Sequence, residues 1–169
     1  MKQEINQNKT GGNELNPMLG AVPLTIELVP RTSWYSNVRA NVTRQEWDII
    51  RRKCYKLANN KCEICGDTSR NQGKKYDLEA HEIWEYDDDT LTQRLTGIVG
   101  LCNYCHTVKH PGLANIQGRG NIVLSQLMKV NNLNKNEAKD MLSKAFAIFD
   151  KRSTKQWNLD VSFLHGYCT

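Results

Sequence analysis

Four cysteines near the middle of this 169-residue sequence have the type and spacing of a metal site. They form two C-x-x-C pairs, in the segments CEIC and CNYC: Cys62, Cys65, Cys102 and Cys105. Each C-x-x-C turn aims two sulfurs at one point, and two such turns supply the tetrahedral thiolate set that zinc prefers. Zinc binding of this kind adds folding free energy, on the order of 10 kcal/mol in small modules. The alternatives are a redox pair or four unrelated cysteines, but the pairing favours structural zinc.

The sequence holds six cysteines, so two lie outside the pairs. Cys54 falls in a helix-patterned segment and is predicted to be a small buried side chain. Cys168, next to the last residue, is predicted to have no role.

Three of the four histidines lie between the cysteine pairs or directly after them. If CNYC opens a helix, His106 and His110 fall on one face, four residues apart, where imidazoles can share one ion. His81 lies in YDLEAHEIW, where alternation along a strand turns Glu79, His81 and Ile83 to the same side. The spacing predicts a second metal site built from three imidazoles. A purely structural role for the three histidines is the alternative.

The elements that must position these residues follow from hydrophobic periodicity and capping signals. The segment TQRLTGIVGLC returns as a second strand, giving strand, loop, strand and short helix with His81 facing the helix-borne pair. A helix is expected from Thr43, whose capping box is completed by Glu46, to Asn59-Asn60. Its apolar face is predicted to include Leu57. Further helices are expected over residues 121–133 and 135–151, the second with a capping box formed by Asn134 and Glu137, and a last strand is expected in WNLDVSFL.

Composition and charge narrow the class of protein. The net charge of +5 fits a polyanionic partner without requiring one. No stretch is long and apolar enough to cross a membrane, and the polar N-terminus lacks the apolar segment of a signal peptide. We therefore expect no membrane association and a reducing cytoplasm, where paired cysteines favour metal over disulfide.

LEAHEI, the strand into LCNYCH, and VKH together resemble the HNH endonuclease family, in the version with two C-x-x-C knuckles. The resemblance covers residues 62–113. It implies an α+β protein with a ββα-metal core, clamped by the four-cysteine zinc site and packed by an N-terminal helix and C-terminal helices. The expected organisation is a flexible tail (1–20), a strand or arm and helix (21–60), the nuclease core (61–115) and a helical extension (116–169).

The resemblance also implies roles for individual residues. His81 takes the family's first metal-ligand position, and Glu82 takes the position of the general base. His106 matches the helix ligand, and His110 matches a further ligand of the colicin-type nucleases. In an alternative register His81 is the base, which leaves Ala80 at the ligand position. The family's usual base is a histidine, and its middle Asn, expected near Thr96 or Gly97, is missing.

The implied function is metal-dependent hydrolysis of phosphodiester bonds in DNA, with structural zinc and a divalent ion (Zn, Ni, Mn or Mg) at the histidines. Asp87, Asp88 and Asp89 are predicted to form a solvated loop, and His165 to be uninvolved. Arg94 and Lys109 flank the site as phosphate contacts or as ordinary surface charge. Two alternatives stay open: an HNH-fold module that binds nucleic acid without cutting it, and a protein-interaction zinc domain.

Overall fold

The computed structural model describes residues 23–167. The predicted flexible tail over residues 1–20 and Cys168 lie outside these residues. Residues 23–30 run as an extended arm without strand pairing, which is one of the two forms expected for this segment. Asn131 holds the arm, since its side chain accepts from Leu24 N (2.8 Å) and donates to Leu24 O (2.9 Å).

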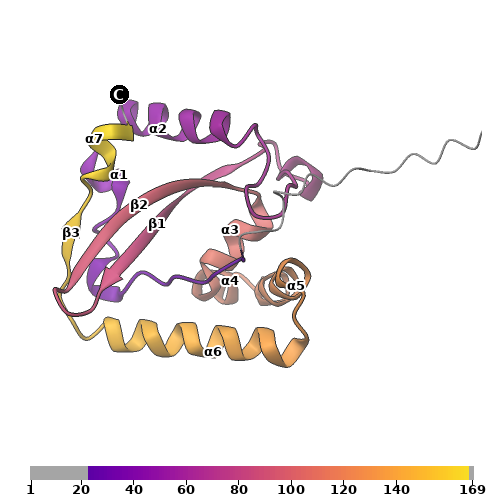
Figure 1. Cartoon of the computed structure of the whole chain (residues 1–169). Helices are drawn as coiled ribbons and strands as arrows, with labels where there is room; N and C mark the ends of the chain where they lie inside the picture. Colours follow the sequence, from indigo (N-terminus) through magenta and orange to yellow (C-terminus); the bar gives the residue numbers. More distant parts are fainter. Residues whose placement is uncertain (1–22, 168–169) are drawn as a thin grey trace, which may run out of the picture.

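The centre of the fold is a long curved hairpin (Figure 1). Strands β1 (Glu79–Asp87) and β2 (Thr92–Leu101) pair antiparallel, with a register shift between Ile83 and Trp84. The short strand β3 (Asn158–Asp160) lies parallel to β2, so the sheet order is β1-β2-β3 and β1 is left as an edge. The hairpin expected from the sequence is confirmed. His81 lies on β1, an edge strand of the sheet.

Helices account for most of the remaining chain, and α2 and α6 lie on opposite sides of the hairpin in Figure 1. Both predicted capping boxes are present, at the starts of α2 and α6. The α+β class is therefore confirmed, whereas membership of the HNH family stays a prediction. The helices are α1 (Val38–Asn41), α2 (Arg44–Leu57), α3 (Asn103–Lys109), α4 (Pro111–Ile116), α5 (Gly120–Asn131), α6 (Lys135–Arg152) and α7 (Phe163–Tyr167), with short 3-10 turns at Arg31–Ser33 and Arg70–Gln72.

Two details differ from the sequence prediction. Only the first part of WNLDVSFL is a strand, and Phe163–Tyr167 forms α7, which returns its apolar side chains to the hairpin. Leu57 is 65% exposed, because α2 ends there and the chain turns through left-handed residues Asn59 and Asn60. Ala58 packs into the core in its place.

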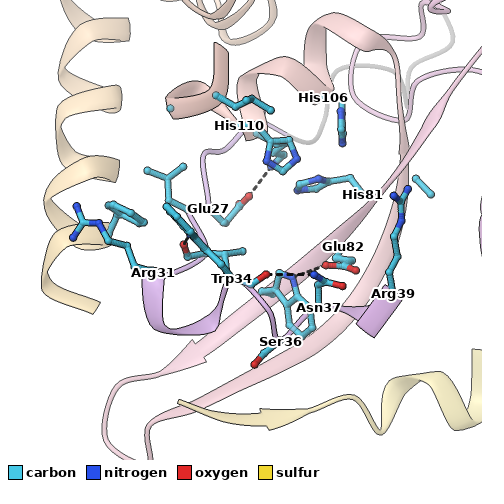
Figure 2. Close-up of a pocket in the computed structure, with 18 of the residues that line it drawn as sticks. Glu27, Arg31, Trp34, Ser36, Asn37, Arg39, His81, Glu82, His106 and His110 are labelled. Carbon is cyan, nitrogen blue, oxygen red and sulfur yellow. Dashed lines mark hydrogen bonds and ion pairs between the residues drawn. The ribbon is translucent and has the colours of Figure 1, made fainter. Parts of the chain in front are cut away.

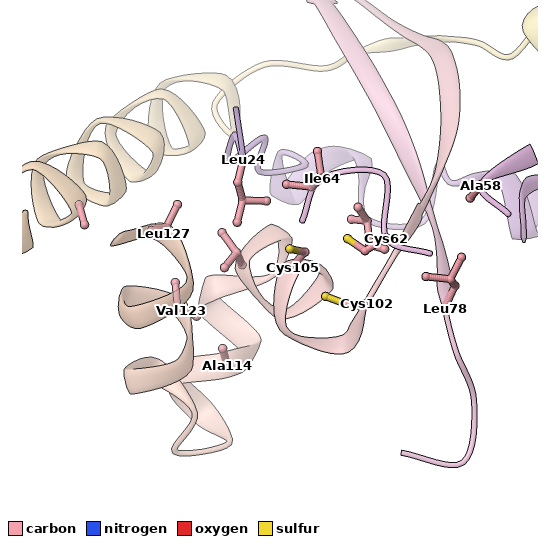
Figure 3. Packing of buried hydrophobic residues seen from close by; sticks show 13 residues of the cluster. Leu24, Ala58, Cys62, Ile64, Leu78, Cys102, Cys105, Ala114, Val123 and Leu127 are labelled. Atoms are coloured by element: carbon pink, nitrogen blue, oxygen red, sulfur yellow. The ribbon is translucent and has the colours of Figure 1, made fainter. Parts of the chain in front are cut away.

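The buried side chains form two clusters. One surrounds the four cysteines and joins the start of the arm to α3, α5 and α6 (Figure 3). The other lies under α2 and α7 and is built on Trp84 and Leu95 of the hairpin with Ile50. The hairpin passes through both, so it fixes the position of α3 relative to α1 and α2. Among the described residues, no helix has the length and apolar character needed to span a bilayer.

Candidate metal centres

The four predicted cysteines converge on one point inside the first cluster. Their sulfurs all lie within 4.8 Å of one another, with Cys65 Sγ 3.5 Å from Cys102 Sγ. A tetrahedral zinc with Zn–S of about 2.3 Å would hold its sulfurs roughly 3.8 Å apart, so the set is compatible with structural zinc. None of the four is in a disulfide.

The surroundings of the sulfurs are those of a closed site. Cys62, Cys102 and Cys105 have no exposed surface. Gln126 of α5 donates from Nε2 to Cys105 Sγ (3.1 Å), which supplies a partner for a buried thiolate. At the first knuckle Gly66 takes a left-handed conformation (φ 73°), and its N–H donates to Cys62 O (2.8 Å), which turns both sulfurs inward.

Cys54 is separate from this cluster, as predicted. It is buried between α2 and β2, where its Sγ lies 3.8 Å from Ile98 O. Burial, with the nearby charge of Glu63, raises the pKa of the Cys54 thiol to about 12. It is therefore a packed neutral thiol.

The three predicted histidines also come together, from three different elements. Ring centroids are 5.3 Å apart for His81 and His106, 5.1 Å for His81 and His110, and 4.7 Å for His106 and His110. One ring nitrogen from each lies within 4.8 Å of the others, so the group could hold a metal ion. Figure 2 shows the three rings converging at one end of a cavity.

His110 reaches this position differently from the expectation of a single helix face. Helix α3 ends at Lys109, and His110 is the hinge residue between α3 and α4, with φ −126° and ψ 54°. Pro111 starts the next helix and prevents α3 from continuing, because proline has no backbone N–H to donate. The three rings therefore come from a strand, a helix and a hinge.

Glu79 orients one of the rings, and sequence analysis did not assign it this role. Its Oε2 lies 3.0 Å from His106 Nδ1, so the imidazole donates there and keeps Nε2 free as a ligand. Glu79 Oε1 accepts from Tyr76 Oη (2.9 Å) and Asn103 Nδ2 (3.0 Å), and Arg119 donates to Asn103 Oδ1 (2.6 Å). Strand alternation placed Glu79 beside His81, and that signal alone could have identified it.

The electrostatics of the site favour neutral imidazoles at His81 and His110 and an ionised Glu79. Burial, followed by the neighbouring His110 and His106, lowers the pKa of His81 well below its usual value. Desolvation and the charge of His106 also lower the pKa of His110. Burial alone would raise the pKa of Glu79, but the hydrogen bond and charge of His106 lower it to about 2. Neutral nitrogens are the form that binds a metal.

Glu82 lies in the same cavity but on the other side of β1 from His81. Its carboxylate accepts from Val38 N (2.8 Å) at the start of α1 and from Trp84 Nε1 (3.2 Å). Burial raises the pKa of Glu82, against these hydrogen bonds and the charge of Arg39. The structure thus gives Glu82 an anchoring contact with α1 that the sequence did not indicate.

The cavity has a volume of about 710 Å³ and lies between the edge strand β1, the arm, α4 and α6 (Figure 2). His81, His106 and His110 line one part of it, and Glu82 lines another. The ion site suggested by the three rings is therefore accessible from a concave space.

The remaining candidate residues are either held in ion pairs or lie away from the histidine cluster. Lys109 lines the cavity, but it is 7% exposed and its Nζ pairs with Glu27 Oε2 at 2.7 Å. Arg94 pairs with Asp160 at 3.0 Å and does not line the cavity. Asp88, in the predicted acidic loop, pairs with Arg152 at 2.7 Å. His165 is exposed on α7 and does not line the cavity.

No protein-family model, curated protein or solved structure matches this chain. The function proposed for it therefore rests on this chain's own residues, on their geometry and on their motif pattern.

Proposed function

We propose that this protein is a metal-dependent endonuclease that hydrolyses phosphodiester bonds in DNA. The observation that carries the proposal is the three-imidazole group. Its nitrogens lie within 4.8 Å of one another, and its rings line a cavity open to a ligand. A purely structural metal site uses all its ligands to close the coordination sphere, whereas three protein ligands leave a position for substrate or water. The resemblance of the same segments to HNH nucleases supports phosphodiesters as the substrate.

The chain's residues have distinct parts in this proposal. His81, His106 and His110 would hold the ion, and Glu79 would fix the orientation and tautomer of His106. When bound, the ion supplies Lewis-acid stabilisation of the charge that develops on the phosphate and on the leaving oxygen. Imidazole ligands suit zinc, nickel and manganese better than magnesium.

Glu82 is the proposed general base, because it lines the same cavity as the histidines and the other carboxylate of that lining, Glu27, is already paired with Lys109. It would take a proton from the attacking water as the water oxygen bonds to phosphorus and the bond from phosphorus to the leaving 3'-oxygen breaks. The leaving oxygen then takes a proton from solvent. A raised pKa makes this carboxylate a stronger base than an exposed glutamate.

Plasmid cleavage tests the proposal. Supercoiled plasmid is incubated with the parent protein and manganese, nickel, zinc or magnesium, beside His81→Ala and the matched control His165→Ala, an exposed histidine outside the site. We expect His81→Ala to lower the cleavage rate more than about 100-fold, since even indirect partners of metal ligands are worth 10–100-fold. His165→Ala should cut like the parent. Cleavage that survives His81→Ala would refute the proposed centre, and a parent that shifts DNA on a gel without cutting it would favour the binding module.

A further inference from the structure

The cavity lined by the histidines has an aromatic wall that takes no part in the proposed hydrolysis step. This wall consists of Trp34, which directly follows the 3-10 turn Arg31–Ser33, and of Phe146 and Phe149 from α6. Trp34 is 56% exposed although it is a large apolar side chain. Its Nε1 donates to Val29 O (3.0 Å), which ties the ring to the arm while leaving ring surface open to the cavity. Exposed, oriented aromatic surface next to a reactive centre is suited to ligand contact.

The size and shape of the cavity limit what can contact this wall. A volume of about 710 Å³ is in the range of sites that enclose a small organic ligand. A single nucleotide is a ligand of this class. In a duplex, each base is stacked on both faces and cannot offer a face to a side chain. An aromatic wall can therefore contact a nucleobase only when the nucleotide is unpaired or turned out of the helix. Ser36 and Asn37 line the cavity near Glu82 and supply polar atoms beside the aromatic surface (Figure 2).

The charges along the cavity also suit a single strand. Three charged residues of the lining are already paired: Glu27 and Lys109 with each other (2.7 Å), and Arg31 with Asp150 (2.8 Å). Arg39 is different. Its guanidinium lies 4.7 Å from the centre of the Trp47 ring, and in the described part of the chain it has no ion-pair partner.

A second groove continues from this arginine along α2. Arg39 and Trp47 line both hollows, and Arg44 and Arg51 line the second, which also reaches Glu79. Arg51 is paired with Asp48 at 2.6 Å, so among the described residues Arg39 and Arg44 are the cations of this path without an ion-pair partner, and the Glu82 carboxylate offsets part of the charge of Arg39. A row of cations beside an aromatic-lined cavity is the combination that binds single-stranded nucleic acid, with phosphates on the cations and bases on the rings.

We propose that the substrate is held as a locally unpaired DNA strand, with one nucleobase against Trp34 in the cavity and adjacent phosphates on Arg39 and Arg44. This inference rests on the proposed function for its choice of substrate. It adds that single strands, flaps or opened duplex, and not continuous duplex, are the preferred form.

Binding is measured separately from cleavage, by fluorescence anisotropy of a labelled single strand and of the matching duplex, without added divalent ion. The protein is the full chain with its cysteine site loaded. Trp34→Ala is compared with Tyr35→Ala, because Tyr35 is the adjacent aromatic residue, is 89% exposed and does not line the cavity. Trp34→Phe keeps the ring and removes the Nε1 donor, which separates stacking from the contact with Val29. Thermal melting of each variant controls for folding.

We expect the parent to bind the single strand more tightly than the duplex. Trp34→Ala should weaken single-strand binding by roughly tenfold or more, whereas Tyr35→Ala should leave it unchanged and Trp34→Phe should restore most of it. Equal affinity for both forms, or equal loss in Trp34→Ala and Tyr35→Ala, would overturn the inference. If these binding results hold but no cleavage is found, the nuclease proposal fails and the inference stands. If continuous duplex is cut and Trp34→Ala has no effect, the nuclease proposal stands and the inference fails.

Discussion

The two clusters of metal-binding side chains differ in what surrounds them. The cysteine cluster lies inside a hydrophobic core, and three of its four side chains have no exposed surface. The ligand atoms of the histidine cluster also lie within 4.8 Å of one another, but this cluster lines a cavity and includes an exposed residue, His110. Four buried ligands suit a structural ion, and three ligands beside open space suit a reactive one. The environment of each set distinguishes them more clearly than the ligand geometry does.

The two clusters are also linked through one helix. Cys105 and His106 are consecutive residues of α3, so the packing that buries the sulfur also sets the direction of the imidazole. The dependence runs one way. Loss of the cysteine cluster should displace His106, whereas loss of a histidine should leave the core around the sulfurs intact.

Cys105→Ser should produce the largest effect. It removes one of four buried ligands, so the free energy of unfolding should fall by several kcal/mol, within the roughly 10 kcal/mol that a structural zinc contributes. Metal content and cleavage should be lost together. Thermal melting measures the loss of stability, zinc analysis measures the metal content, and plasmid cleavage measures the activity. Cys54→Ala is the control, because that thiol is buried outside the cluster. A Cys105→Ser protein that melts like the parent would show that the sulfurs do not stabilise the fold through a metal.

Glu82→Gln should come next. The amide oxygen can still accept from Val38 N–H, but the amide nitrogen cannot accept from Trp84 Nε1, so the free energy of unfolding should fall by about 1 kcal/mol, while loss of the basic carboxylate should lower kcat by about 10²–10⁴. Initial cleavage rates and melting curves separate the two roles. A lower melting temperature with unchanged kcat would make Glu82 an anchor for α1, and His81 would then have to be reconsidered as the base.

Glu79→Gln should have an intermediate effect, confined to the histidine cluster. The change removes the negative charge that accepts from His106 Nδ1, so affinity for manganese or nickel should fall 10–100-fold by calorimetry. Zinc in the cysteine cluster should be unchanged. Glu85→Gln, an exposed glutamate of the same strand, serves as the matched control. Equal metal affinity in both variants would contradict an orienting role for Glu79.

Gln126→Leu should have the smallest effect, and only on the closed site. It removes the donor to Cys105 Sγ while keeping a side chain of similar size, and we expect a loss of about 1 kcal/mol in the free energy of unfolding. Denaturant titration measures the loss. Cleavage should stay within about twofold of the parent, and a larger loss of activity would mean that strain in the cysteine cluster is transmitted to His106.

Much of both clusters could be predicted because their signals are local. The C-x-x-C spacing predicted which sulfurs meet, and strand alternation predicted that His81 faces α3. The capping boxes at Thr43 and Asn134 predicted where α2 and α6 begin. Each of these patterns depends on residues a few positions apart, whose relative geometry is set by the backbone of a single turn, helix or strand.

Other features of the site depend on residues far apart in the chain. The contact between Glu82 and Val38, and the pairing of Lys109 with Glu27, each join an element of the core to the arm or to α1. No local pattern marks either pair, and the sequence prediction treated Lys109 as a phosphate contact or ordinary surface charge. His110 was likewise expected on one helical face, but Pro111 makes it a hinge residue.

The sequence by itself determined the ligand types, their spacing and the strands and helices that carry them, because these follow from side-chain chemistry and short-range backbone geometry. The tertiary structure alone decided that one ligand set is closed and the other open. It also decided that Trp34, which follows the arm, and Phe146, from α6, line the same cavity as the histidines. The physical reason is that burial and cavities arise where distant segments pack, and that packing is a property of the whole fold.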